Sequence, residues 1–154
     1  MTIIAITNEL DYPWELLLLA DPEASLVAAY LKTSQTFVKV NSTSEVLGVL
    51  VLRKEAEDHY ELMNLAVAEA YQSMGIGQEL VEYGIKEIKS RQQSEARLIV
   101  KTGDLSYPAI RLYQRCGFQI KEVIEDYFIK NYPEAIYEEG QQLKNQLILE
   151  LLIN

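Results

Sequence analysis

The chain has 154 residues and a net charge of −9, and 49% of its residues are hydrophobic while 24% are charged. This composition predicts one globular domain over residues 1–154, with enough apolar mass for a core of two layers. The acidic balance argues against nucleic acid as a partner, and the apolar runs are too short to cross a bilayer, so we expect no membrane partner. The single cysteine, Cys116, and the lack of a cationic leader predict a cytoplasmic protein.

The first half of the chain is predicted to contain two short helices and four strands. Residues 2–7 alternate weakly in hydropathy and predict a first strand. Proline near a first turn favours one helix from about residue 14 and another that begins at residues 21–23 and runs to about residue 32. Segments rich in Val, Leu and aromatic residues, with polar hairpin turns between them, predict strands at 36–40, 46–53 and 59–67.

The second half of the chain alternates helices with strands. Apolar residues recur with helical spacing from Ile76 to Ile88, and the polar segment 90–95 ends this helix. Similar patterns predict a strand at 98–102, a helix at 106–116 and two long strands at 118–127 and 143–152. This order of elements predicts an α/β (α+β) layer architecture.

A glycine turn joins the strand at 59–67 to the following helix. Gly75 and Gly77 carry no Cβ, so the free N–H groups of the first helical turn can close around a pyrophosphate that the helix dipole also attracts. The alternative is a tight turn that only allows close helix packing. A Walker A loop is excluded because Gln78 and Glu79 replace Lys and Ser/Thr, and Leu80 replaces the third glycine of a dinucleotide fingerprint.

The segment Gln72-x-x-Gly75-x-Gly77 resembles the acetyl-CoA loop of the GNAT superfamily of N-acetyltransferases. Residues 109–118 are similar to the helix and strand of that superfamily that end in Tyr-x-x-x-Gly-Phe, and residues 126–140 resemble a loop of a bacterial subgroup. The resemblance covers residues 14–152. It implies the GNAT fold, a central mixed and mostly antiparallel sheet flanked by helices, with acetyl-CoA as cosubstrate and no metal.

The resemblance also implies which residues bind acetyl-CoA. They lie on the strand before the turn, in the turn and on the later helix: Leu65, Ala66, Val67, Gln72, Ser73, Met74, Gly75, Ile76, Gly77, Gln78, Ser106, Ala109 and Tyr113. The segment at residues 86–115 is basic and suits an anionic cofactor. Two residues depart from the family, since Ser106 replaces a common asparagine and Lys101 stands where a ribosomal-protein-modifying branch has a glutamate base.

Tyr113, Glu61 and Asn64 are the candidate catalytic residues. Tyr113 falls on the position that faces the cofactor sulfur, and its phenol, of pKa ~10, can donate to a thiolate whose acid has a pKa of ~8.5; the alternative is an aromatic core residue. Glu61 falls on the position of a general base, although a solvated strand residue is an equal alternative. In a regular strand Tyr60 and Asn64 lie on the face opposite Glu61, where either could orient a water.

The acceptor site is predicted between the N-terminal helices and the aromatic, acidic loop at 127–139. Trp14, Tyr127, Tyr132 and Glu134 are its candidate residues, because aromatic walls with carboxylates suit a cationic amine. The tyrosines have two alternative roles, packing of the last strands or a homodimer contact.

These patterns predict an acetyl-CoA-dependent N-acetyltransferase that acts on a primary amine, and the predicted acceptor is a small cationic amine. One alternative is a protein N-terminal or lysine acetyltransferase, whose partner would be a peptide and which would need an open groove. A second alternative is a catalytically silent acyl-CoA-binding regulatory module. Retention of Tyr113 beside the glycine turn favours the enzyme.

Overall fold

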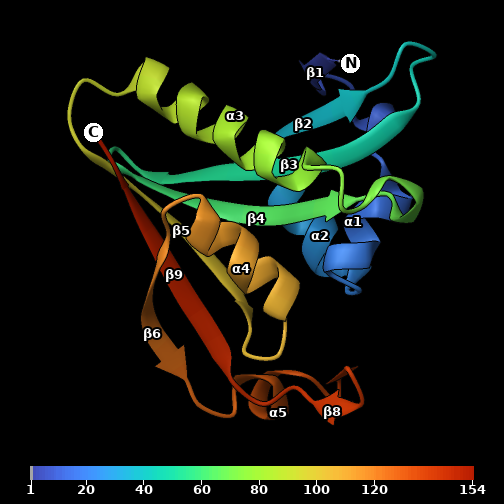
Figure 1. Cartoon of the computed structure of the whole chain (residues 1–154), viewed down its shortest axis with the longest axis vertical. Coiled ribbons are helices and arrows are strands. Elements are labelled where there is room, and N and C mark those ends of the chain that lie inside the picture. The colour runs from blue at the N-terminus through green and yellow to red at the C-terminus, as the bar shows by residue number, and fades with distance from the viewer. Residues whose placement is uncertain (1) are drawn as a thin grey trace.

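A seven-stranded sheet forms the centre of the protein, as a computed structural model that describes residues 2–154 shows (Figure 1). Every pair of neighbouring strands is antiparallel except β4 and β5, so the predicted mixed, mostly antiparallel sheet is confirmed. Across the sheet the strands are β1 (Thr2–Ala5), β2 (Gln35–Val40), β3 (Val46–Ala56), β4 (His59–Val67), β5 (Ala96–Gly103), β9 (Gln146–Ile153) and β6 (Gln119–Ile124).

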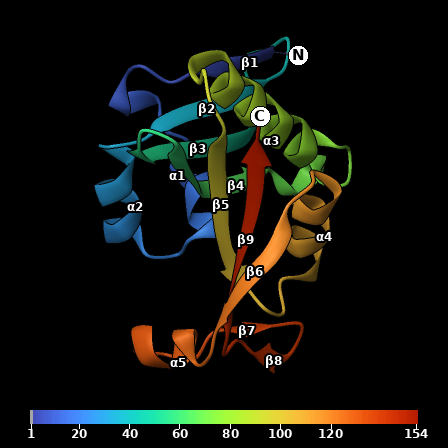
Figure 2. The same cartoon turned by 90° about the vertical axis from the view of Figure 1, so that its left-hand side faces the viewer.

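Helices cover both faces of the sheet, as the turned view in Figure 2 shows. The helices α1 (Trp14–Ala20) and α2 (Ala24–Leu31) lie on one face, and α3 (Ile76–Arg91) and α4 (Tyr107–Arg115) lie on the other. Short elements complete the chain: η1 (Glu9–Asp11), η2 (Glu69–Tyr71), α5 (Tyr127–Asn131), β7 (Tyr137–Glu138) and β8 (Gln141–Gln142). Within residues 2–154, every helix is too short or too polar to span a bilayer.

Alternating side chains of the central strands feed two separate cores. In β3, Leu50 and Leu52 point towards α3, where they join a core that includes Leu80. Their neighbours Val49 and Val51 point the other way, into the core beneath α1 and α2. Because both faces of β3 are buried from Leu47 to Leu52, its sequence there is continuously apolar rather than alternating.

The sheet opens between β4 and β5. The two strands pair only from His59 to Leu62 on β4 and from Arg97 to Val100 on β5, after which they diverge (Figure 1). Strand β4 continues to Val67 with β3 as its only partner strand among the described residues. The far edge of this part of β4 therefore has no partner strand among the described residues and can bind an extended ligand.

The C-terminal segment differs from the predicted pair of long strands. Strand β6 ends at Ile124 instead of residue 127, because Asp126 has a φ of 56° and its N–H donates to Asn145 Oδ1 at 3.0 Å. The chain then turns into the short helix α5, so Tyr127 is helical. Strand β9 begins at Gln146 rather than at residue 143.

Candidate active site

A first cavity of about 430 Å³ lies between the end of α1, the open edge of β4, the glycine turn and α4. Of the residues predicted to bind the cofactor, all except Met74 and Ser106 line it. Met74 is mostly exposed, since it points away at the tip of the turn. Residues that the sequence did not single out also line the cavity: Leu19, Ala20, Tyr71, Pro108, Leu112 and Arg115.

The glycine turn combines the two roles that its sequence allows, a ligand-binding turn at Gly75 and close helix packing at Gly77. Ser73 and Gly75 adopt left-handed conformations, with φ of 65° and 83°, while a Cβ added at Gly75 would meet no atom within 4 Å. Gly77 is needed for packing, because a Cβ there would lie 2.9 Å from Leu112 Cδ1. The side chain of Gln72 braces the turn by donating to the Val67 carbonyl at 3.1 Å.

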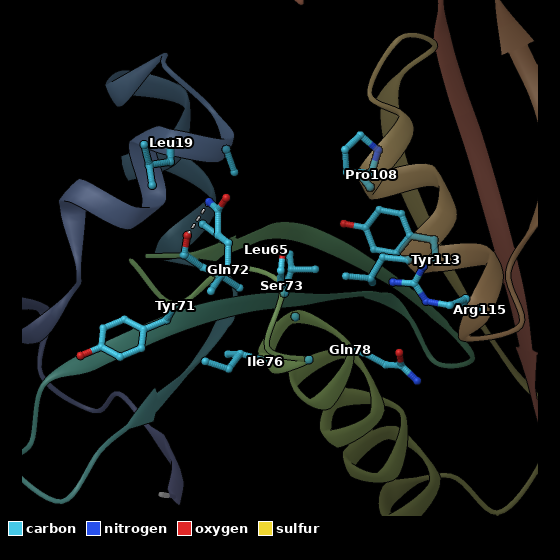
Figure 3. A pocket seen from close by; sticks show the side chains of 17 residues that line it. Leu19, Leu65, Tyr71, Gln72, Ser73, Ile76, Gln78, Pro108, Tyr113 and Arg115 are labelled. Atoms are coloured by element: carbon cyan, nitrogen blue, oxygen red, sulfur yellow. Dashed lines mark hydrogen bonds between the residues drawn. The ribbon is translucent and has the colours of Figure 1, made fainter. Parts of the chain in front are cut away.

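The first cavity has the features of an anion site. Ile76, Gly77 and Gln78 of the first turn of α3 border it, and the N–H groups of a first helical turn have no acceptor within the helix. The guanidinium of Arg115, on α4, adds positive charge across the cavity (Figure 3). Its residues therefore fit the pyrophosphate and the extended arm of a coenzyme A molecule.

Tyr113 offers a proton donor to this cavity. Its side chain is only 5% exposed and packs against Phe118, with ring centroids 5.5 Å apart. Figure 3 shows its hydroxyl pointing from α4 towards the space beside Leu65. Burial, and then the nearby Cys116, raises the pKa of the Tyr113 hydroxyl, so the phenol stays protonated at neutral pH. In this position the Tyr113 ring can pack in the core while its hydroxyl faces the cavity.

A second cavity, of about 710 Å³, lies on the face of the sheet that carries α1 and α2. Side chains from distant parts of the chain form its wall, among them Asp21, Tyr30, Arg53, Glu61, Lys101, Ser106, Tyr127, Phe128, Tyr132, Tyr137, Glu138 and Gln146. Leu19 and Ala20 line both cavities. The two cavities therefore meet at the end of α1.

Two of the four predicted acceptor residues line the second cavity. Tyr127 and Tyr132 do so, and with Phe128 they form an aromatic cluster whose ring centroids are 5.2 to 6.5 Å apart. Trp14 and Glu134 line neither cavity. Trp14 stands at the first turn of α1, whereas the last turn of that helix reaches the cavity.

Ser106 faces the second cavity rather than the first. Its hydroxyl donates to Glu138 Oε1 at 2.7 Å. The hydroxyl is therefore engaged in the wall of the second cavity.

The prediction that Asn64 lies on the face of β4 opposite Glu61 is wrong, because β4 contains a bulge. Leu52 pairs with Leu62 and Val51 with Asn64, so Met63 has no partner on β3. The extra residue brings Asn64 onto the same face as Glu61. Tyr60, before the bulge, stays on the opposite face, as expected.

Asn64 lies beneath the site and does not open into it. Its Nδ2 donates to the Leu17 carbonyl and to Tyr30 Oη, both at 2.9 Å. The residue is 3% exposed and lines neither cavity. These contacts tie α1 and α2 to β4.

Glu61 is buried at the point where β4 and β5 begin to diverge. Its side chain is 10% exposed, which excludes the alternative of a solvated strand residue. Its Oε1 lies 3.6 Å from Lys101 Nζ, so a basic partner neutralises the carboxylate. Among residues 2–154 no group of three His, Cys, Asp or Glu side chains is arranged to bind a metal ion.

Comparison with known proteins gives one family. A model described as "Acetyltransferase (GNAT) family" matches residues 5–118. The N-acetyltransferase YvbK of Bacillus subtilis (strain 168) is 35% identical over 141 residues, which is 92% of this chain and 89% of that protein.

Solved structures are similar along nearly the whole chain. A GNAT family acetyltransferase from Elizabethkingia anophelis, solved with acetyl-CoA bound, has a TM-score of 0.90 and 33% identity, with 97% of this chain and 96% of that chain covered. A protein described as IAA acetyltransferase, from Bacillus cereus ATCC 14579, has a TM-score of 0.88 and 35% identity, covering 98% of this chain and 99% of that one.

Proposed function

The chain belongs to the GNAT family of acetyl-CoA-dependent N-acetyltransferases, and on that premise we propose that its acceptor is a small cationic primary amine held in the second cavity. One observation carries the proposal: the two cavities meet at Leu19 and Ala20, beside the open edge of β4. An amine in the second cavity can thus approach an acetyl group held in the first, without a covalent acetyl-enzyme.

The first cavity is proposed to hold acetyl-CoA through the residues that line it. The turn at residues 72–77 and the start of α3 would receive the pyrophosphate, and the free edge of β4 at Leu65 to Val67 would receive the extended arm. Acetyl-CoA supplies an acetyl group activated as a thioester. Every other step depends on how the protein orients the amine and manages two protons.

Tyr113 is proposed as the donor that stabilises the departing thiolate. The burial that raises the pKa of its hydroxyl keeps the proton on Oη until negative charge develops nearby. Glu61 lines the second cavity and not the first, and it is proposed to accept the proton of the amine through a water. Asn64 would act only through the position of α1.

The shape and lining of the second cavity support a small molecule over a protein substrate. Helix α2 contributes one wall, and α5 and β7 contribute another, so an acceptor would lie between two walls. Aromatic rings and two carboxylates that form no ion pair among residues 2–154, those of Asp21 and Glu138, favour a cation. That the protein is cytoplasmic and forms a homodimer are predictions from the sequence alone.

A screen of amines and peptides for release of the CoA thiol tests the proposal. We expect amine-dependent release with small cationic amines, little release with neutral or anionic amines, and an acetylated product in each positive reaction. Release only with peptides would favour the protein acetyltransferase. Binding of acetyl-CoA without transfer to any acceptor would favour the silent module and overturn the proposal.

A further inference from the structure

Five charged side chains line the second cavity, and only three of them form ion pairs. Both basic residues have partners, since Arg53 Nε lies 2.5 Å from Glu55 Oε1 and Lys101 Nζ lies 3.6 Å from Glu61 Oε1. The remaining two, Asp21 and Glu138, form no ion pair among residues 2–154. The cavity thus contains two carboxylates whose charge the chain leaves uncompensated.

Asp21 lies in the wall of the second cavity, where two backbone hydrogen bonds fix its position. Its N–H donates to the Leu17 carbonyl at 3.2 Å and ends α1, while its Oδ1 accepts from the N–H of Glu23 at 3.2 Å. Burial raises the pKa of the Asp21 carboxyl, against the lowering effect of this hydrogen bond. It directly follows Ala20, which borders both cavities, so Asp21 is the unpaired carboxylate beside the junction.

Aromatic hydroxyls flank Asp21. Burial, and after it the negative charge of Asp21, raises the pKa of the Tyr132 hydroxyl. Tyr30 Oη accepts from Asn64 Nδ2 and lines the cavity, and a hydroxyl oxygen has a second lone pair that can accept from an ammonium group. An ammonium group beside Asp21 would meet a carboxylate, two hydroxyl oxygens and a ring face, all of which stabilise a cation.

Glu138 is the second unpaired carboxylate. It belongs to the short β7 strand, and its only side-chain partner among the described residues is the Ser106 hydroxyl, at 2.7 Å. A neutral donor satisfies a lone pair but does not balance a charge. Partly buried carboxylates of this kind are stabilised by a cation that the chain does not provide.

We propose that the acceptor carries two cationic groups, of which the amine to be acetylated binds at Asp21 and the second binds at Glu138. The rings of Tyr127, Phe128 and Tyr132 would cover the apolar link between the two groups. The inference rests on the proposed function and narrows its substrate class to diamines and amines with a second basic group. A monoamine would leave Glu138 uncompensated.

The test compares linear diamines of increasing length with monoamines of the same carbon number. For the best diamine we expect kcat/KM to exceed that of its monoamine partner by at least about tenfold, the effect of one charged contact. Glu138→Gln should remove this preference by lowering kcat/KM for the diamine alone. Asp21→Asn, which retains the Oδ1 acceptor that caps residue 23, should raise KM for both amines.

Two variants serve as matched controls. Glu23→Gln removes an exposed charge two residues from Asp21, and Glu134→Gln removes one near Glu138 in sequence, while neither residue lines a cavity. Both controls should retain the wild-type ratio of diamine to monoamine. If they lower this ratio as much as Glu138→Gln does, general electrostatics explains the preference and the inference is wrong.

Calorimetric titration of each amine into the CoA-bound protein separates the inference from the proposed function. Diamine binding that is about tenfold tighter than monoamine binding, and that weakens in Asp21→Asn and Glu138→Gln, supports the inference even if no acetyl group is transferred. Equal binding of diamine and monoamine overturns the inference. Amine-dependent acetylation of both would then leave the proposed function intact.

Discussion

The two cavities differ in the kind of groups that line them. The first is built largely from one contiguous stretch, residues 65–78, whose backbone and glycines shape it, and α4 closes it. The second is built from side chains on α1, α2, β3, β4, β5, α5 and β7. A backbone-lined cavity suits one constant ligand, whereas a side-chain-lined cavity can change its ligand by substitution without loss of the fold.

Their charges differ as well. Arg115 and the start of α3 make the first cavity attractive to an anion, while two unpaired carboxylates make the second attractive to a cation. The junction at Leu19 and Ala20 brings the two ligands together. Substitutions on either side should therefore affect one substrate and spare the other.

The largest expected effect is that of Tyr113→Phe, in the first cavity. The ring and its packing on Phe118 remain, but the proton donor is lost. We expect kcat to fall by about 10² to 10⁴, the range typical of proton-transfer groups, with little change in acetyl-CoA affinity. Steady-state kinetics and calorimetry measure the two quantities, and an unchanged kcat would reduce Tyr113 to a packing role.

A charge in the glycine turn should break the anion site. Gly75→Asp places a carboxylate where an added Cβ meets no other atom, so the main changes are charge and backbone strain at a φ of 83°. Gly75→Asn is the matched control, since it has the same shape and a similar strain without the charge. We expect acetyl-CoA affinity to fall more than about tenfold below that of the control, and equal affinities would contradict a pyrophosphate site at this turn.

Asn64→Ala tests the hydrogen bonds that tie α1 and α2 to β4. It removes two buried hydrogen bonds, those from Asn64 Nδ2 to the Leu17 carbonyl and to Tyr30 Oη, so we expect a loss of about 1 to 3 kcal/mol in the free energy of unfolding. Chemical denaturation measures this loss. If stability were unchanged while kcat fell a hundredfold, Asn64 would be catalytic instead of structural.

The smallest effect is expected outside both cavities, at Glu150. A hydrogen bond from Lys121 is the main reason that the pKa of the Glu150 carboxyl lies below its usual value. A lowered pKa in the folded state means that this stabilisation is present above the unfolded-state pKa and disappears as the pH falls through the folded-state pKa. Glu150→Gln should cost less than about 1 kcal/mol at neutral pH, because its basic partners are exposed.

Chemical denaturation at neutral and acidic pH measures the loss of unfolding free energy in Glu150→Gln. The difference between wild type and Glu150→Gln should shrink in acid, and kcat should stay unchanged at neutral pH. A difference that grows in acid would contradict the assigned sign.

The first cavity could be predicted from the sequence because its residues are close together in the chain. The spacing of Gly75 and Gly77 after an apolar strand indicates a ligand-binding turn, and the apolar face of α4 places Tyr113 towards the sheet. Arg115 carried no comparable signal, since one basic residue at a helix end is usually solvated.

The second cavity could not be predicted to the same degree, because it depends on how distant elements pack. The bulge at Met63 decides which face Asn64 takes, and a one-residue bulge is fixed by pairing with β3 that no local pattern of β4 reveals. The aromatic ring of Trp14 predicts a place in the acceptor site, whereas Asp21, at the predicted start of a helix, carries no such signal. Which end of α1 reaches the cavity depends on the tertiary structure.

Initial-rate kinetics with both substrates varied tests the central claim, direct transfer of an acetyl group between two cavities that meet at Leu19 and Ala20. Release of the CoA thiol is followed while acetyl-CoA is varied at several fixed concentrations of a cationic amine, and the acetylated amine is identified by mass spectrometry. We predict intersecting double-reciprocal lines, the pattern of a complex that contains both substrates. Parallel lines, which indicate a covalent acetyl-enzyme, or thiol release that does not depend on the amine, would contradict the account.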